Sequence, residues 1–412
     1  MNNWQTKKLG EVLDGIVGGG TPSKEKPEYW NGSIAWASVK DITRFNSFGT
    51  QDYITEEGLK NSSSRLIKAG TLIMPTRMAL GLTVQFAIDV AINQDLKALY
   101  IKSILHKEFL KYWFESKRSK IKKMGTGSTV DGIQVGDLKS LKINLPEKPE
   151  QQRIVSVLET WDEYLELLDK KIALKERLKK GLMQQLLTGK KRLPGPNDNF
   201  KYTILSYYAK DDKNAIVDGP FGSQMKLTEF TNHGVPVIEM YHLKNTIIDN
   251  NKLNRYVSID KFNSDLKRSE VTDGDIVISK TGSLGYLGIF RGIDNAVITS
   301  RLAKISINEK KACTGFIFQY LKYMKEISYW ERIGQGGTMK ILSIGDFKKM
   351  PIPKLSLDEQ LDIAAILEKL DELLADLKIL RVLKVNQKKY LLKNLITGRI
   401  RTPENLTLER SL

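Results

Sequence analysis

The sequence predicts a mixed α/β protein in which two globular domains are separated by two long antiparallel coiled-coil helices, arranged as a pseudo-two-fold tandem repeat. Three observations support this prediction: a recurring segment, a heptad pattern in each of its copies, and short β-rich runs elsewhere. The boundaries we expect are a domain at 1–149, a helix at 150–189, a linker at 190–200, a second domain at 201–356, a second helix at 357–398 and a tail at 399–412.

The internal repeat is the strongest of these observations. Residues 136–192 align without a gap with residues 345–401, and about 22 of the roughly 57 positions are identical, which chance does not give. The globular segments before each copy are related more weakly, as in KAGTLIMPTRMALG (68–81) and TDGDIVISKTGSLG (272–285). This difference indicates a shared scaffold that carries two different specificities.

Each copy of the repeat reads as one long helix. Apolar residues recur at alternating steps of three and four, from Ile154 to Leu186 and from Ile363 to Leu395, which is the seam of a coiled coil. No proline interrupts either stretch, and Gly189 and Gly398 are residues that end helices. The alternative, a helix buried in a large core, is disfavoured because each helix has only one apolar stripe.

An antiparallel pair is expected because the linker between the first helix and the second domain is short. Residues 190–200 span at most about 40 Å, whereas each helix is about 55–60 Å long. The two globular domains show short β-rich runs such as SIAWASV, VPVIEM and DIVIS, each bounded by turn residues. We expect mixed α/β domains, and no repeated strand–helix–strand spacing argues for a parallel sheet.

Composition excludes several classes of protein. The single cysteine, Cys313, rules out an intrachain disulfide, and the three histidines are not spaced as metal ligands. No apolar run approaches the roughly 18 residues of a membrane span, so we expect a cytoplasmic protein with no membrane partner. The formal charge is +17, with 65 Lys and Arg against 48 Asp and Glu. Such a surface favours nucleic acid, although a basic composition also serves solubility alone.

Glycine-rich loops with neighbouring cations recur in both domains, as in GGGTPSK (18–24) and GPFGSQMK (219–226). Such loops let backbone N–H groups approach phosphates, although most are plain turns. Arg77, Lys280 and Arg301 lie at loop edges, where they could read guanine, whereas the charge run before Lys123 could be a solvated helix face. The candidate DNA contacts are Lys24, Lys40, Arg77, Lys123, Ser128, Lys226, Lys280, Ser283, Arg301 and Lys340.

Sequence signatures of catalysis are missing. The chain has no GxxxxGK[ST] run for nucleotide phosphates, no GxGxxG after a strand, no paired-histidine metal motif and no Gly-x-Ser-x-Gly elbow. It also lacks the Asp/Asn-Pro-Pro-aromatic run that amino-methyltransferases use to orient a target amine. We therefore expect no catalytic residues, no bound metal and no covalent chemistry in this chain.

Three sets of residues form a recognisable pattern: the opening WQTKKLGEVLDGIVGGGTPSKEKPEYWNGSIAWASVKDI (4–42), the pair LPEKPEQQRIVSVLETWDE (145–163) and LSLDEQLDIAAILEKLDE (355–372), and the pair QQLLTGKKR (184–192) and KNLITGRIR (393–401). With these residues, the chain as a whole resembles the specificity subunit of type I restriction-modification enzymes. The second domain departs from the opening of the first and has GPFGSQMKLTEF (219–230) instead, which suggests two different half-sites.

The resemblance implies that each globular domain is a target recognition domain for one half of a bipartite, asymmetric double-stranded DNA site. It implies that the helices set the half-site spacing and dock two methylation subunits, and that two restriction subunits join. S-adenosylmethionine, ATP and Mg²⁺ are then expected on the partners, with no cofactor on this chain, which alone is expected to be monomeric. The helix residues expected to contact the methylation subunits are Gln151, Arg153, Asp162, Glu163, Gln360, Asp371 and Glu372.

Two alternatives from other classes stay open. A coiled-coil adaptor would join proteins without sequence-specific DNA recognition, and it predicts no DNA binding even when its partners are supplied. A stand-alone nuclease or methyltransferase with divergent motifs predicts activity from the purified chain.

Overall fold

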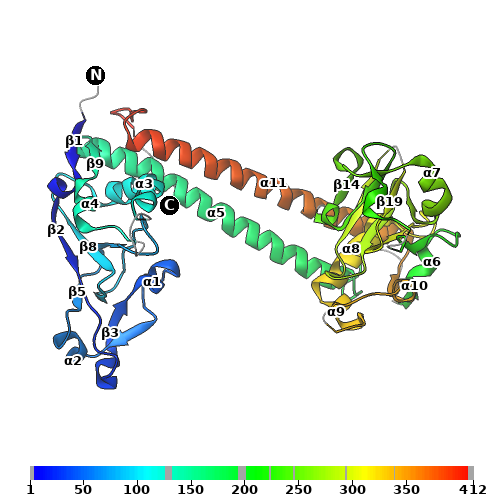
Figure 1. Ribbon diagram of the computed structural model, residues 1–412, viewed down its shortest axis with the longest axis horizontal. Helices are drawn as coiled ribbons and strands as arrows, with labels where there is room; N and C mark the ends of the chain where they lie inside the picture. The colour runs from blue at the N-terminus through cyan, green and yellow to red at the C-terminus, as the bar shows by residue number, and fades with distance from the viewer. Residues whose placement is uncertain are drawn as a thin grey trace. The chain divides into compact units, whose positions relative to one another are not determined.

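The computed structural model describes residues 4–125, 132–193, 201–221, 224–244, 246–292, 295–337 and 339–406. Contacts divide the chain into two compact units. Unit 1 is Met1–Asp169 with Ile379–Leu412, and unit 2 is Lys170–Lys378. Each unit therefore combines one globular domain with part of both long helices, whose course can be followed by colour in Figure 1.

The two long helices are α5 (Lys148–Leu186) and α11 (Leu357–Ile396), which lie within a few residues of the predicted ranges. Gly189 (φ 69°) and Gly398 (φ 71°) follow them in the left-handed conformation that ends a helix and favours glycine. No helix among the described residues is long and apolar enough to cross a membrane.

Ion pairs within each unit show that α5 and α11 run antiparallel. In unit 1, Lys388 pairs with Asp162 and Arg381 pairs with Asp169. In unit 2, Lys378 pairs with Glu176 at 2.7 Å and Asp371 pairs with Lys179 at 2.5 Å. In both units the number on α11 falls as the number on α5 rises, which confirms the predicted antiparallel pair.

The described residues of unit 1 form three sheets and several α-helices. The sheets are β1 (Gln5–Lys8) with β9 (Lys142–Leu145); β2 (Leu13–Gly18), β8 (Leu96–Ile101) and β6 (Leu72–Pro75); and β4 (Asp52–Ile54), β3 (Trp30–Ala37), β7 (Val90–Ile92) and β5 (Arg65–Ile67). The α-helices of the domain are α1 (Val39–Thr43), α2 (Glu56–Lys60), α3 (Lys107–Gly125) and α4 (Val135–Ser140).

Unit 2 repeats this plan, with more strands in its two larger sheets. The sheets are β10 (Lys201–Ile204) with β21 (Pro351–Lys354); β11 (Ile216–Asp218), β20 (Leu302–Ile305), β17 (Ile276–Ser279), β18 (Leu287–Arg291) and β14 (Ile247–Asp249); and β12 (Phe230–Thr231), β15 (Tyr256–Val257), β13 (Val235–Ile238), β19 (Ala296–Ile298) and β16 (Glu270–Val271). The α-helices of the domain are α6 (Leu205–Tyr208), α7 (Ile259–Lys261), α8 (Thr314–Glu326), α9 (Tyr329–Ile333) and α10 (Ile344–Lys348).

Both domains contain parallel strand pairs, which the sequence did not predict. Strand β3 pairs in parallel with β7, β13 with β19, and β14 with β18. The connection from β3 to β7 contains two short helices and three strands instead of one crossover helix. No strand–helix–strand spacing is therefore present in the sequence to reveal the parallel pair.

The core of each unit is completed by the end of the helix from the other repeat. In unit 1, Leu392, Leu395 and Ile396 of α11 are buried in the cluster that holds Phe109 and Trp113 of α3. In unit 2, Met183 and Leu186 of α5 and the following Leu187 lie in the cluster that holds Phe316 and Trp330. The first repeat thus supplies core residues to the second domain, and the second repeat supplies core residues to the first domain.

Candidate nucleic-acid interface

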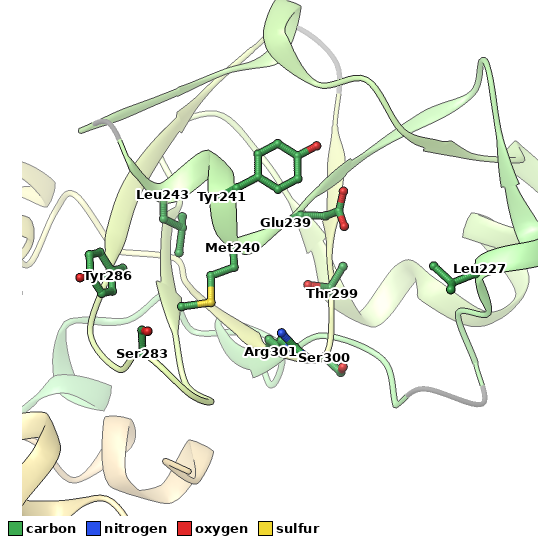
Figure 2. Close-up of a pocket in the computed structure, with 10 residues that line it drawn as sticks. All are labelled: Leu227, Glu239, Met240, Tyr241, Leu243, Ser283, Tyr286, Thr299, Ser300 and Arg301. Atoms are coloured by element: carbon green, nitrogen blue, oxygen red, sulfur yellow. The ribbon is translucent and has the colours of Figure 1, made fainter. Parts of the chain in front are cut away.

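Each domain has a recess where its pair of parallel strands ends. Recess 1, in unit 1, has a volume of about 460 Å³ and opens beyond the carboxyl ends of β3 and β7. It is lined by Thr21, Lys24, Trp30, Trp36, Ser38, Lys40, Asp52, Asn93 and Gln94. Recess 2, in unit 2, has a volume of 670 Å³ and opens beyond the carboxyl ends of β13 and β19 (Figure 2). It is lined by Leu227, Glu239, Met240, Tyr241, Leu243, Ser283, Tyr286, Thr299, Ser300 and Arg301.

Strand register shows that the two recesses occupy the same place in the fold. Ala37 pairs with Ile92 at the end of one parallel pair, and Ile238 pairs with Ile298 at the end of the other. The residues that follow these strands line both recesses, so Ser38 corresponds to Glu239. By the same register, Asn93 and Gln94 of unit 1 correspond to Thr299 and Ser300 of unit 2. One position in the fold therefore carries two different sets of side chains.

The glycine-rich loops lie against these strand ends. A Cβ on Gly19 would overlap with the carbonyl oxygen of Ile92, and a Cβ on Gly219 would overlap with that of Thr299. Glycine is required at both positions because the two backbones approach too closely for a side chain. The first loop carries the exposed Lys24 into recess 1, and the second leads to the exposed Lys226 beside Leu227 of recess 2.

Recess 1 combines two exposed lysines with amide and aromatic side chains. Lys24 and Lys40 are both exposed, and Lys40 lies in the first turn of α1. The hydroxyl of Thr21 donates to Oε1 of Gln94 at 2.8 Å, which fixes the orientation of that amide. Trp36 is buried, and its Nε1 donates to the Gly20 carbonyl at 3.2 Å. A fixed amide and two mobile cations are groups that bind base edges and phosphates, respectively.

Recess 2 has one acidic and one basic side chain. The carboxylate of Glu239 accepts a hydrogen bond from Arg255 Nη1 at 3.0 Å, so its charge is compensated within the domain. Burial and the nearby Glu239 carboxylate raise the pKa of Tyr241, whose hydroxyl donates to Asn254 at 2.8 Å. Arg301 is exposed, and Figure 2 shows it with Ser283 and Ser300 below Met240 in that view.

Comparison with known proteins identifies the family. The model of the type I restriction modification DNA specificity domain matches residues 1–176 and 222–384 of this chain.

The chain belongs to the type I restriction-modification specificity family.

Curated specificity subunits are similar over different lengths. The MjaIX specificity subunit of Methanocaldococcus jannaschii is 26% identical over 370 residues, which cover 84% of this chain and 82% of that protein. The EcoR124I/EcoR124II specificity subunit of Escherichia coli is 37% identical over 166 residues, or 39% of this chain and 40% of that protein.

Solved structures of the same family show a similar fold. The S subunit of a type I system from M. genitalium is 19% identical, with a TM-score of 0.56 over 95% of this chain and 96% of that chain. A chain from a study of complex assembly and conformational transition in a type I system is 17% identical, with a TM-score of 0.63 over 96% and 98% of the two chains.

In this specificity subunit, four of the ten predicted DNA contacts line the recesses: Lys24, Lys40, Ser283 and Arg301. Lys226 and Lys123 are exposed outside the recesses, and Ser128 lies outside the described residues. Sequence reasoning missed Gln94, Glu239 and the tryptophans. A usable signal existed for Glu239, which directly follows β13 inside the predicted β-rich run VPVIEM, whereas Gln94 follows β7, which none of the named runs covers.

The other three predicted contacts have partners within the chain. Arg77 lies 3.6 Å from Asp95, and Nζ of Lys340 donates to the Glu331 carbonyl. Lys280 pairs with Asp218 at 3.1 Å, and only 12% of its side chain is exposed. Lys280 is therefore poorly placed to reach a base edge, and we leave it out of the interface proposed below.

Gln151 and Gln360 occupy matched positions at the starts of the two long helices, and both are fully buried. Oε1 of Gln151 accepts from the His106 N–H at 2.7 Å, and Oε1 of Gln360 accepts from the Cys313 N–H at 3.0 Å. Each glutamine thus fastens the start of a long helix to the domain before it. Gln151 and Gln360 present no surface to a partner in this specificity subunit, and the partner interface proposed below omits them.

Two of the predicted partner contacts hold the helices together. Asp162 accepts from Lys388 Nζ at 2.7 Å and from the Tyr112 hydroxyl at 2.7 Å. Asp371, in the corresponding position, accepts from Lys179 at 2.5 Å, from Gln319 at 2.9 Å and from Lys322. Burial raises the pKa of the Tyr112 hydroxyl, and its bond to the Asp162 carboxylate raises it further.

The remaining predicted partner contacts have different exposures. Glu163 and Glu372 are exposed, whereas Arg153 is half-buried and donates to the Thr402 hydroxyl at 3.3 Å. Of the seven helix residues singled out by the sequence, Glu163 and Glu372 are the two that are exposed.

The structure also reveals a reciprocal pair of ion pairs between the repeats. Arg192 binds Glu359 through two hydrogen bonds of 2.7 and 2.6 Å, and Arg401 binds Glu150 through two of 2.5 and 2.7 Å. Both arginines occupy the last aligned position of a repeat, and both glutamates lie at the start of a long helix. The alignment contained this signal, because opposite charges stand at matched positions in both copies.

Proposed function

We propose that this chain is the non-catalytic, DNA-reading subunit of a type I restriction-modification complex. Each globular domain reads one half of a bipartite, asymmetric double-stranded DNA site. The observation that carries this proposal is the pair of equivalent recesses with different linings. A shared fold grips two stretches of the same polymer, and different side chains at one position read different sequences.

Phosphate contacts would come from exposed cations around the recesses. Lys24 and Lys40 border recess 1, and Lys226 lies beside recess 2. Lysine is a mobile point charge on a long stem, which suits phosphate binding at positions where sequence is not read. Lys123, Arg77, Ser283 and Lys340 remain candidates for contacts outside or at the edge of the recesses.

We further propose that the long helices set the distance between half-sites and dock two methylation subunits. Exposed apolar side chains on the helices support docking, among them Leu167 in unit 1 (64% exposed) and Leu174 in unit 2 (63% exposed). The exposed Glu163 lies one helical turn from Leu167, and it and the exposed Glu372 would contribute polar contacts. Two restriction subunits would join this assembly.

The chemistry would reside on the partners, which would hold S-adenosylmethionine, ATP and Mg²⁺. Among the described residues, no group of three or more His, Cys, Asp or Glu side chains is placed to hold a metal ion. This chain would then supply position and sequence choice, while the methylation subunits transfer methyl groups to adenine N6.

The test is co-expression of this chain with the methylation subunit encoded beside it, followed by mapping of N6-methyladenine across the host DNA. We expect a split motif with one methylated adenine on each strand around a fixed unspecified gap. The methylation subunit expressed alone is the control and should give no such motif. No new methylation from a soluble, assembled complex would contradict the proposal and favour a coiled-coil adaptor.

A further inference from the structure

Two corresponding positions beside the recesses carry opposite charges. Asp95 is the third residue after β7, and Arg301 is the third residue after β19. Their backbones have the same partner in each domain, because the Thr76 N–H donates to the Asp95 carbonyl at 2.8 Å and the Lys280 N–H donates to the Arg301 carbonyl at 2.9 Å. The two residues are therefore equivalent in the fold.

The two side chains also differ in how they are paired. The Asp95 carboxylate has Arg77 at 3.6 Å, and 22% of its side chain is exposed. Arg301 makes no side-chain hydrogen bond or ion pair with any residue in the described part of the chain. The acidic residue of the same recess, Glu239, is engaged by Arg255 instead. The guanidinium of Arg301 is thus left with its donors available to a ligand.

This difference separates sequence reading from phosphate binding. A phosphate contact is the same for every sequence, so equivalent phosphate-binding positions in two domains should both be basic or neutral. A carboxylate at the position of Asp95 would be repelled by a phosphate. A position that is acidic in one domain and basic in the other is therefore suited to base edges, which differ between half-sites.

The chemistry around Arg301 favours one base. A guanidinium donates two parallel hydrogen bonds to O6 and N7 of guanine, which is the commonest specific contact in the major groove. The backbone on both sides is fixed, because the Leu302 N–H donates to the Thr299 carbonyl at 3.0 Å and Lys280 holds the Arg301 carbonyl. Ser283 and Ser300 supply hydroxyls beside it in the recess.

We propose that Arg301 reads a guanine in the half-site of the second domain, and that the first domain makes no such contact at the equivalent position of Asp95. This inference rests on the proposed function and adds to it the residue and the base. Recess 2 would then be the specificity determinant of the second half-site.

The test compares three complexes of this chain with its methylation subunit: wild type, Arg301→Gln and Arg291→Gln. Arg291→Gln is the matched control, since this substitution removes the same charge from the same domain. It lies at the end of β18, whereas Tyr286 of recess 2 directly precedes the start of that strand. At about 3.3 Å per residue, the strand separates these ends by roughly 15 Å.

We expect Arg301→Gln to lose preference for guanine at one position of one half-site. Binding to duplexes that carry each base at that position should show discrimination reduced roughly tenfold to a hundredfold. The other half-site should be read as before, and Arg291→Gln should retain the wild-type motif. Arg301→Lys should restore part of the affinity but not the discrimination, because lysine lacks the bidentate fork.

Three outcomes would overturn the inference while leaving the proposed function intact. One is a bipartite wild-type motif without guanine in the half-site that Arg301→Gln affects. Another is an unchanged motif in the Arg301→Gln complex. The third is an equal loss of affinity for every duplex that Arg301→Lys restores in full, which would make Arg301 a phosphate contact. A wild-type complex without any bipartite motif would instead contradict the proposed function itself.

Discussion

Single arginine side chains at the ends of the repeats, Arg192 and Arg401, form ion pairs that contribute to the stability of each unit. Arg192 and Glu359 are 24% and 10% exposed, whereas Arg401 and Glu150 are 45% and 7% exposed. Glu150 also accepts from Trp4 Nε1 at 3.0 Å. Removal of Arg401 therefore leaves the Glu150 carboxylate with one remaining donor, the indole of Trp4. Removal of Arg192 leaves the Glu359 carboxylate, which is 10% exposed, without its charged partner.

We expect Arg192→Gln to lower the free energy of unfolding of unit 2 by about 2 kcal/mol, because an unpaired buried carboxylate is costly. Arg401→Gln should cost unit 1 clearly less, since Glu150 keeps its hydrogen bond from Trp4 and the Arg401 side chain is itself 45% exposed to solvent screening. Urea unfolding with tryptophan fluorescence measures this, because Trp330 is the one tryptophan after residue 170 and reports unit 2. Lys190→Gln, at an exposed neighbouring position, is the control. Equal losses for the two arginines would refute the argument from the Trp4 hydrogen bond and the exposure of Arg401.

Asp371 makes the stability of unit 2 depend on pH. Burial alone would raise the pKa of this carboxyl, but hydrogen bonds from Lys179 and Gln319 and the charge of Lys322 outweigh it and hold the pKa below 3.8. At a pH well above the ordinary value of 3.8 the carboxylate is charged in both the folded and the unfolded chain, and its full stabilisation is present. Below that value the unfolded chain binds a proton first, so the stabilisation is lost as the pH falls.

The stability advantage of wild type over Asp371→Asn should accordingly be largest near about pH 7 and should shrink as the pH falls toward about 3. Thermal unfolding followed at Trp330 over this range gives the comparison. Asp376→Asn, an exposed change on the same helix, controls for net charge. If the advantage over Asp376→Asn shrank by the same amount, the effect would belong to overall charge and not to the Asp371 contacts.

Single residues of the recesses were only partly predictable from the sequence. Lys24, Lys40, Ser283 and Arg301 could be chosen because cations and hydroxyls beside glycine loops are visible as letters. Lys280 looks identical by that criterion, yet it pairs with Asp218, a residue far away in the sequence. The pairing of a charged side chain depends on tertiary contacts, and no local pattern reports them.

At the scale of elements, the sequence predicted the two long helices well, whereas it predicted the short strands poorly. Helices α5 and α11 follow from heptads that extend over many turns and from glycine stops. Strands of two to four residues, such as β12 and β19, are too short to show an alternating pattern. Their parallel pairing depends on residues far apart in the chain, so the two recesses could not be located from the sequence.

The helices offer a direct test of spacing. Insertion of seven residues between Asp169 and Glu176, matched by seven between Lys378 and Arg381, keeps the coiled-coil seam and lengthens each helix by about 10 Å. We expect the unspecified gap in the methylated motif to grow by up to about three base pairs, because DNA advances about 3.4 Å per base pair. Insertion in one helix alone is the control and should abolish methylation. A gap that stays constant after the matched insertion would refute the spacing role.

At the scale of the whole molecule, each unit depends on sequence from both repeats. Leu186 and Leu395 occupy matched positions in the repeat, and both are buried, at 2% and 3% exposure. Leu186 belongs to the core of unit 2, and Leu395 belongs to the core of unit 1. The order of the chain therefore predicts the wrong domain for each of these residues.

We expect Leu395→Ala to destabilise unit 1 and Leu186→Ala to destabilise unit 2, each by about 2–5 kcal/mol, because a buried leucine leaves a cavity. Hydrogen exchange resolved by peptide measures this, since protection should fall in residues 4–125 for the first variant and in residues 201–337 for the second. Protection lost mainly in the domain that precedes the mutated helix would contradict the crossed arrangement.

The crossed cores also have a consequence for synthesis on the ribosome. Unit 2 is one continuous stretch, Lys170–Lys378, whereas unit 1 also needs Leu392, Leu395, Ile396 and Arg401, which are translated after unit 2. Because chains are synthesised from the amino terminus, the first globular domain is completed only after the second has been translated. Until then, the core residues of the first domain that pack against the end of α11 stay uncovered. A ribosome that stalls or terminates before α11 is complete would release a chain in which unit 2 is folded and unit 1 is a target for chaperones and proteases.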